Sequence, residues 1–237
     1  MENSVIKRMF SAYRAIFFTL VASALLAGCA TMLAPSSDDL VCEGSAEYSL
    51  TFLSNWSVET HPESFPLNPH YSRLVGATHR PESIIWAPGK PATNGVKQVA
   101  EKGLNSKFKK EIDWAIKTGQ ASSYIDAPDM KLSPGKVDTR FTVSTDFPLV
   151  SVLSMIAPSP DWIVGASGLS MCENANWVLE KVVVLRAYDA GTDAGQSYLA
   201  KDKPEAEKQI VEYLKSDLYS INGQVPAFGE LRFELVR

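Results

Sequence analysis

The chain of 237 residues carries 23 lysine and arginine residues against 27 aspartate and glutamate residues, which gives a formal net charge of −4 at pH 7. This mildly acidic balance argues against a surface that attracts nucleic acid or anionic lipid. The roughly 200 residues that follow the N-terminal segment suit one domain of sandwich or barrel size.

The N-terminal segment predicts export. Lys7, Arg8 and Arg14 precede an almost wholly apolar run over residues 15–27, and residues 26–29 read Leu-Ala-Gly-Cys. This pattern is typical of a secretory signal that ends in a bacterial lipobox. A transmembrane helix needs about 20 apolar residues, so this run is too short to span a bilayer. An ordinary secretory peptide followed by a coincidental cysteine remains the alternative.

The lipobox divides the chain into three parts. Residues 1–28 are predicted to be a signal peptide, and Cys29 becomes a lipid-bearing N-terminus that anchors the protein to a membrane. Ala30 follows the cysteine where an inner-membrane retention signal would have aspartate, so we expect the outer membrane of a bacterial envelope. Residues 29–41 are mostly small and polar and predict a flexible tether, which leaves residues 42–237 as the folded domain.

The folded part is predicted to be mostly β. Residues 47–52 and 139–143 alternate apolar and polar side chains, as strands with one buried face do. Residues 150–156 are largely apolar and suit a central, buried strand, whereas residues 178–185 and 231–236 are rich in β-forming residues.

Two helices are expected to interrupt the strands. Ser106 can cap a helix over residues 107–117, which ends before Gly119 and places Phe108, Ile112, Ala115 and Ile116 near one face.

A second helix is predicted from Pro204 to about Ser216, with Ile210, Tyr213 and Leu214 facing inward. Both helices are interpreted as packing elements without a chemical role.

Cysteine usage agrees with export. Once Cys29 carries lipid, Cys42 and Cys172 remain, and in an oxidising compartment such a pair is most simply a disulfide. Two free buried thiols are the alternative, and a catalytic thiol is less well supported because neither cysteine has a histidine nearby in sequence.

Two turn-forming segments, residues 158–162 and 188–195, contain three aspartates, which are Asp161, Asp189 and Asp193. Two glycines in the second segment give its backbone freedom to curl around a small cation, and calcium prefers carboxylate and carbonyl oxygens. The spacing is not that of an EF-hand, because alanines occupy the positions of the required glycine and glutamate. On spacing alone, solvated aspartates that cap turns are the simpler explanation.

Several motifs follow one another from about Cys42 to about Leu199. They are residues 48–56, His61-Pro62, Ser72, residues 76–79, Trp86, Gly89, residues 94–96, residues 100–103, residues 151–162, Gly165, Cys172 and residues 188–195. The most specific string runs over residues 155–162. The order and spacing of these motifs resemble the spondin domain, the N-terminal adhesive module of the F-spondin and mindin extracellular-matrix proteins.

The resemblance implies an antiparallel β-sandwich similar to calcium-dependent membrane-targeting domains, with a calcium ion between loops at one end. The metal carboxylates of the family fall on Asp161, Asp189 and Asp193, and its two cysteines fall on Cys42 and Cys172. The thrombospondin-type repeats that often follow the module in animal proteins are missing, which weakens any transfer of animal matrix partners.

Other chemistries are weaker alternatives. His61, His70 and His79 suggest zinc, but their nine-residue spacing fits no common zinc motif, so structural hydrogen bonding is favoured. A nucleophile elbow at residues 165–168 lacks its second glycine, and a hydrolase assembled from a serine with His79 and Asp146 has no sequence signature.

The sequence therefore predicts a lipid-anchored, calcium-binding spondin-domain protein that acts as a binding or adhesion module and not as an enzyme. Its expected partners are the membrane, through the N-terminal lipid, and an extracellular or periplasmic protein or glycan, with no nucleic acid. An envelope hydrolase and a metal-free structural component of the envelope are the rival hypotheses.

Overall fold

The computed structural model describes residues 41–63, 65–215 and 224–236, all within a unit that spans Pro35–Arg237. The predicted signal peptide, Cys29 and the tether as far as residue 40 lie outside the described residues. Within the described part of the chain, no helix is long and apolar enough to cross a bilayer.

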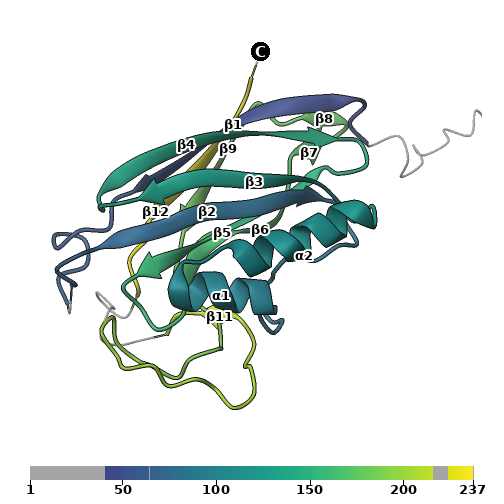
Figure 1. The fold of residues 1–237 in the computed structure, drawn as a ribbon. Coiled ribbons are helices and arrows are strands. Elements are labelled where there is room, and N and C mark those ends of the chain that lie inside the picture. Colours follow the sequence, from purple (N-terminus) through teal and green to yellow (C-terminus); the bar gives the residue numbers. More distant parts are fainter. Residues whose placement is uncertain (1–40, 64, 216–223, 237) are drawn as a thin grey trace, which may run out of the picture. The chain divides into compact units, whose positions relative to one another are not determined.

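Two antiparallel sheets form the framework of the described part of the chain (Figure 1). The smaller sheet has the order β4-β1-β12-β9, and its strands are β4 (Gly135–Ser144), β1 (Ser45–Ser54), β12 (Gly229–Leu235) and β9 (Glu180–Leu185). The larger sheet has the order β11-β10-β6-β5-β2-β3, and its strands are β11 (Glu212–Tyr213), β10 (Tyr188–Asp189), β6 (Trp162–Ser170), β5 (Leu149–Ala157), β2 (His70–His79) and β3 (Ala121–Met130). A short hairpin joins β7 (Cys172–Glu173) to β8 (Asn176–Trp177).

The two sheets pack face to face around the main hydrophobic core. Leu50 and Phe233 of the smaller sheet belong to the same buried cluster as Tyr71, Val152 and Val164 of the larger sheet, and all five side chains are fully buried. Removing this apolar surface from water stabilises the sandwich by about 25 cal/mol for each Å² buried. The predicted all-β antiparallel sandwich is confirmed.

The larger sheet is buried on its second face as well, because two helices cover it. These are α1 (Asn94–Lys102) and α2 (Ser106–Lys117), which lie over the larger sheet in Figure 1. A second hydrophobic cluster joins Val96 of α1 and Phe108 of α2 to Val75, Leu153 and Ile163 of the sheet.

Burial on both faces explains the apolar sequence of β5. This strand lies between β6 and β2, and every residue from Val150 to Ala157 is buried. The expectation of a central, buried strand at residues 150–156 is therefore confirmed.

The predicted helix over residues 107–117 is present as α2, with Phe108, Ile112 and Ala115 buried. Its predicted cap is wrong, because Asn105 occupies the N-cap and the Ser106 hydroxyl donates instead to the side-chain carbonyl of Gln98 at 3.1 Å.

Helix α1 was not predicted, although both its ends carry sequence signals. The hydroxyl of Thr93 accepts a hydrogen bond from the amide of Val96 at 3.1 Å, and Gly103 ends the helix with φ +62°. A threonine cap and a left-handed glycine are the signals that begin and end many helices.

The helix predicted from Pro204 to Ser216 is wrong. The amides of Glu205 and Gln209 donate to the carbonyls of Thr192 and Gly191, and residues 212–213 pair as β11 with β10. Of the three residues expected to face inward, Leu214 is buried, whereas Ile210 and Tyr213 are about half exposed. Long-range pairing with the 188–195 segment therefore overrides the local helical pattern.

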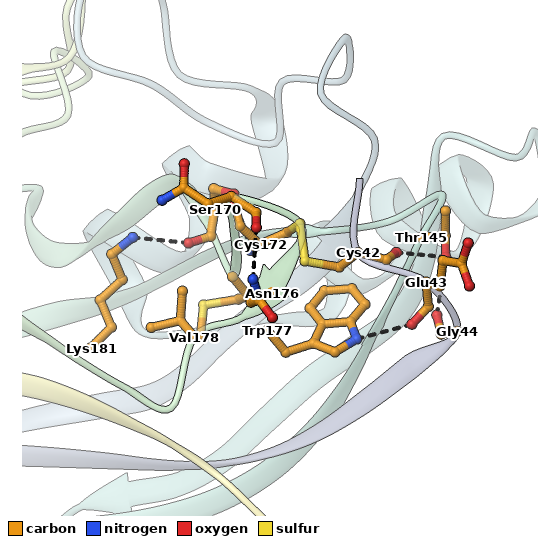
Figure 2. The surroundings of a disulfide bond; sticks show 12 residues. Cys42, Glu43, Gly44, Thr145, Ser170, Cys172, Asn176, Trp177, Val178 and Lys181 are labelled. Carbon is orange, nitrogen blue, oxygen red and sulfur yellow. Dashed lines mark hydrogen bonds between the residues drawn. A yellow bond between two sulfur atoms is a disulfide. The ribbon is translucent and has the colours of Figure 1, made fainter. Parts of the chain in front are cut away.

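The predicted disulfide between Cys42 and Cys172 is present, with the two Cα atoms 5.8 Å apart. Figure 2 shows its surroundings, in which the hydroxyl of Thr145 donates to the carbonyl of Cys42 at 2.8 Å and the indole of Trp177 donates to the carbonyl of Glu43 at 3.1 Å. The bridge spans a sequence separation of 130 residues and ties the chain before β1 to the β7–β8 hairpin.

Loss of the disulfide should destabilise the domain. Closing a loop of this length removes entropy from the unfolded chain, for which the chain-entropy model gives about 4–5 kcal/mol as an upper value. We expect the double variant Cys42→Ala/Cys172→Ala to unfold about 2–4 kcal/mol more easily in urea than the oxidised wild type. Reduction of the wild type should have the same effect, and equal stability of the oxidised and reduced proteins would contradict this prediction.

Candidate functional site

The three predicted metal ligands lie near one end of the larger sheet. Asp161 immediately precedes β6, Asp189 is the last residue of β10, and Asp193 follows four residues later. Because β10 pairs with β6 and places Asp189 opposite Trp162, the structure brings Asp161 and Asp189 next to each other.

The carboxylate of Asp161 is fully buried and organises the loop that follows β10. Its Oδ2 accepts hydrogen bonds from the amide of Thr192 at 2.7 Å and the amide of Asp193 at 3.0 Å, and also from the Thr192 hydroxyl at 3.2 Å. Its Oδ1 is buried without a hydrogen-bond donor. Such an oxygen is costly in a folded protein unless a ligand or ion satisfies it.

Electrostatics at this site disfavour a negative charge. Burial, followed by the neighbouring Asp189 charge, raises the pKa of Asp161 to about 6. The pKa of Asp189 is raised by burial and then by the carboxylates of Glu212, Glu205 and Asp193, although the amide of Gly191 donates to its Oδ1 at 2.7 Å. Mutual repulsion of this kind is what a bound cation relieves.

The carboxylate of Asp193 accepts hydrogen bonds from two backbone amides. Its Oδ1 accepts from the amide of Gly195 at 2.8 Å and its Oδ2 accepts from the amide of Lys203 at 2.7 Å, so both oxygens are used within its own loop. Among the described residues, no group of three or more histidine, cysteine, aspartate or glutamate side chains is gathered closely enough to hold a metal ion. Asp193 nevertheless lies beside the other two aspartates, since its amide donates to Asp161 and its charge acts on Asp189.

The glycines of this loop serve close packing. Gly191 has φ +69°, and a Cβ there would lie 2.7 Å from the carbonyl of Gln209. A Cβ on Gly195 would lie 2.7 Å from the ring of Pro160. The absence of a Cβ at both positions lets the loop lie close to these neighbouring segments.

The donor set at Asp161 and Asp189 suits a hard cation. It offers carboxylate oxygens, which calcium prefers, and Asp161 Oδ1 has no hydrogen-bond donor. Neither histidine nor cysteine belongs to it, so the ligands that zinc prefers are missing from this pair. A cation held by both carboxylates fits the residues present.

Two further residues, neither of them recognised from the sequence, support the loop. Thr192 donates twice to Asp161, and its carbonyl accepts from the ammonium group of Lys97 on α1 at 3.3 Å. Lys97 also pairs with Glu101 one turn further along the helix. The position of Thr192 between two aspartates was visible in the sequence, but the contact with Lys97 spans 95 residues and carries no local signal.

Trp162 connects the site to the main core. Its ring is buried in the main core and meets the edge of Tyr198 with ring centres 5.2 Å apart. Tyr198 in turn packs against Trp56 at 5.4 Å, so the segment after the loop is fixed to the sandwich.

The three histidines serve separate structural contacts. His61 is buried against Phe228 with ring centres 4.4 Å apart, and its Nδ1 lies 2.9 Å from the Thr60 hydroxyl. His70 Nδ1 lies 2.9 Å from the carbonyl of Asn68. No zinc cluster forms in the part of the chain that the structure describes.

The serine that the structure places beside His79 is Ser151, whose Oγ lies 2.8 Å from His79 Nε2. This Oγ also accepts from the amide of Gly168 at 2.8 Å, and His79 Nδ1 lies 2.9 Å from the carbonyl of Arg80. His79 and Ser151 are both buried, whereas Asp146 is exposed and does not hydrogen-bond to His79. The pair thus links β2 to β5 and β6 and does not face a substrate cleft.

Comparison with known proteins agrees with the architecture. Residues 46–226 match the Spondin_N family. The chain is 37% identical to spondin-1 of Gallus gallus and 36% identical to spondin-1 of Homo sapiens, each over 188 residues that cover 77% of this chain and 23% of the relative. It is 32% identical to spondin-2 of Homo sapiens over 183 residues, which cover 72% of this chain and 55% of the relative. The chain therefore spans between about a quarter and about half of these relatives.

Because the pKa of Asp161 is raised on folding, ionisation of this carboxyl should lower the free energy of unfolding of the metal-free protein. This penalty depends on pH. The unfolded carboxyl loses its proton near pH 4 and the folded one near pH 6, so the penalty is absent below about pH 4 and complete above about pH 6. In a chelator at pH 7, Asp161→Asn should raise the free energy of unfolding by about 1–3 kcal/mol, because the amide removes the buried charge and keeps an acceptor for the loop amides.

The gain should vanish at pH 4, where the wild-type carboxyl is protonated as well. Urea unfolding at both pH values measures it, and Asp202→Asn, at an exposed aspartate, is the matched control. A loss of stability in Asp161→Asn at pH 7 would show that the buried charge carries no penalty.

Proposed function

Because the chain belongs to the spondin N-terminal domain family, we propose that it is a lipid-anchored, calcium-binding adhesion module of the bacterial envelope. Its homologues are extracellular-matrix spondins, which are not enzymes, and we extend that non-enzymatic role to this chain.

The observation that carries the calcium proposal is the buried Oδ1 of Asp161, which has no donor and lies beside Asp189. When bound, calcium would supply positive charge to both carboxylates. Asp161 and Asp189 would hold the ion, and Asp193 would join them by releasing one of its two backbone hydrogen bonds. Calcium accepts six to eight oxygen ligands, so loop carbonyls or water would complete its shell.

Lipid anchoring is supported by the Leu-Ala-Gly-Cys string at residues 26–29 after an apolar run. About 12 residues separate Cys29 from Cys42, and an extended chain of that length reaches at most about 40 Å. The lipid would hold the domain close to the outer membrane, and the metal loop would shape its contact with a protein or glycan partner.

Calcium should stabilise the wild type and fail to stabilise variants of its ligands. A ligand that binds the folded state alone adds RT ln(1 + [L]/Kd), which is about 2.7 kcal/mol at a hundredfold excess over Kd. We expect calcium to raise the melting temperature of metal-stripped wild type, and Asp189→Asn and Asp161→Asn to lose most of that response. Magnesium should substitute poorly because it needs a smaller and more regular shell.

Asp202→Asn should respond to calcium as the wild type does. Identical melting of the wild type in millimolar calcium and in chelator, with no heat of binding in calorimetry, would remove the calcium site from the proposal.

Replacement of Cys29 should release the protein from the membrane, since the acyl chains would have no thiol to join. We expect Cys29→Ser to remain unprocessed or to fractionate as a soluble protein, without incorporation of radiolabelled palmitate. Palmitate labelling that persists in Cys29→Ser would contradict the anchor and leave the calcium proposal untouched.

A further inference from the structure

The outer side of α2 carries three lysines and a tryptophan in one line. Lys107, Lys110, Trp114 and Lys117 follow one another at intervals of three, four and three residues, which places them on a single face of the helix. All four are exposed, and the Trp114 side chain is 60% exposed. We call these four residues the lysine–tryptophan stripe.

The charges of the stripe are not neutralised within the described part of the chain, where none of its three lysines forms an ion pair. Of the two acidic residues of α2, Glu111 also lines the groove described below, but both its oxygens accept hydrogen bonds from the start of α1. Asp113 pairs with Lys109 at 2.7 Å on another side of the helix. Glu111 accepts from the amide of Gly95 at 2.7 Å and from the hydroxyl of Thr93 at 2.6 Å, which fastens α2 to the start of α1. The stripe is thus a positive surface on an acidic protein.

An apolar groove of about 500 Å³ runs beside the stripe, between α2 and the segment after β2. Its lining includes Phe108 and Ile112 of α2 together with Ile85, which are buried members of the second hydrophobic cluster. Ile84, which is 61% exposed, and Trp114 also line it. Exposed apolar side chains grouped around a hollow are typical of a binding surface.

The chemistry of the groove selects an amphipathic ligand. Lys110 lines the hollow together with the apolar residues, so a ligand that fills it with an apolar side chain can place an anion beside this ammonium group. The volume lies within the range of specific ligand pockets, about 300–1,000 Å³. The stripe covers ten residue steps, or about 15 Å, which is the length of four to five residues of extended chain.

Either an anionic lipid surface or an acidic peptide segment could bind a positive surface that carries an exposed tryptophan. A flat membrane surface has no projecting side chain to occupy the groove, whereas a peptide inserts one and lays its flanking residues along the helix. We propose that the stripe and the groove bind a short acidic segment of a partner protein. A large apolar side chain of that segment fills the groove, and carboxylates on either side of it meet Lys107, Lys110 and Lys117.

The proposed peptide binding names a class of partner for the adhesion function. It rests on that function in one respect, because it takes the partner to be a protein. It uses no residue of the loop around Asp161 and Asp189. Binding here should persist in a chelator, which separates failure of this inference from failure of the calcium site.

Selection from a displayed library of random heptapeptides tests the proposal directly. The full chain, purified in detergent and held in chelator, should enrich peptides with a large apolar or aromatic residue flanked by aspartate or glutamate. A synthetic copy of the enriched peptide should bind the wild type in solution, and raising the salt from 0.1 M to 1 M should weaken it strongly, because the Debye length falls from about 10 Å to about 3 Å.

Substitutions on the stripe should remove this binding. We expect Trp114→Ala and Lys110→Glu each to weaken the synthetic peptide at least tenfold while the melting temperature stays that of the wild type. Lys201→Glu is the matched control, since it makes the same charge change at an exposed lysine outside α2, and it should bind as the wild type does. Replacing the apolar residue of the peptide with serine should abolish binding.

Three results would overturn the proposal. The first is a selection that enriches no acidic, apolar peptides. The second is a peptide that binds Trp114→Ala and Lys110→Glu as tightly as it binds the wild type. The third is that no peptide ligand is found, while the wild type binds vesicles of anionic phospholipid and Lys110→Glu does not. That result would assign the stripe to a membrane surface.

Discussion

Burial of the larger sheet on both faces is the constraint on which this structure depends. β5 contributes Val152 to the sandwich core and Leu153 to the cluster beneath the helices, so neither face of the strand meets water. Polar groups on such a strand must find partners inside the protein, and Ser151 does so with His79 and the amide of Gly168. Neither face of β5 therefore has room for chemistry that needs solvent or an ion.

Asp161 lies at one such end, and its carboxylate serves two purposes that conflict. Oδ2 orders the following loop through the amides of Thr192 and Asp193, whereas Oδ1 is left buried without a donor beside another carboxylate. A purely structural acceptor would not need the second oxygen or the neighbouring charge of Asp189. The unsatisfied oxygen and the repulsion between the two carboxylates therefore lower the stability of the metal-free fold. A bound cation would remove that cost, which is the physical basis of the calcium proposal.

The sequence predicted elements whose burial follows from local pattern. The apolar run of β5 and the periodic apolar face of α2 were recognised, because burial of these residues shows directly in the local pattern of apolar side chains. Residues 204–216 were wrongly assigned to a helix. Their hydrogen bonds with Gly191 and Thr192 connect distant parts of the sequence, so no local pattern indicates them. The family resemblance indicated the three aspartates, but it did not indicate that both oxygens of Asp193 accept from the amides of Gly195 and Lys203. The position of the stripe on α2 follows from helical spacing, whereas the groove beside it needed the fold.

A crystal structure of the metal-stripped protein soaked in millimolar calcium, with anomalous differences recorded, tests the central claim most directly. We expect one calcium peak in contact with Asp161 Oδ1 and a carboxylate oxygen of Asp189, at about 2.3–2.6 Å from each, with loop carbonyls or water completing the shell. An Asp161 Oδ1 that is protonated or bound to water, with no cation peak between the two aspartates, would contradict it.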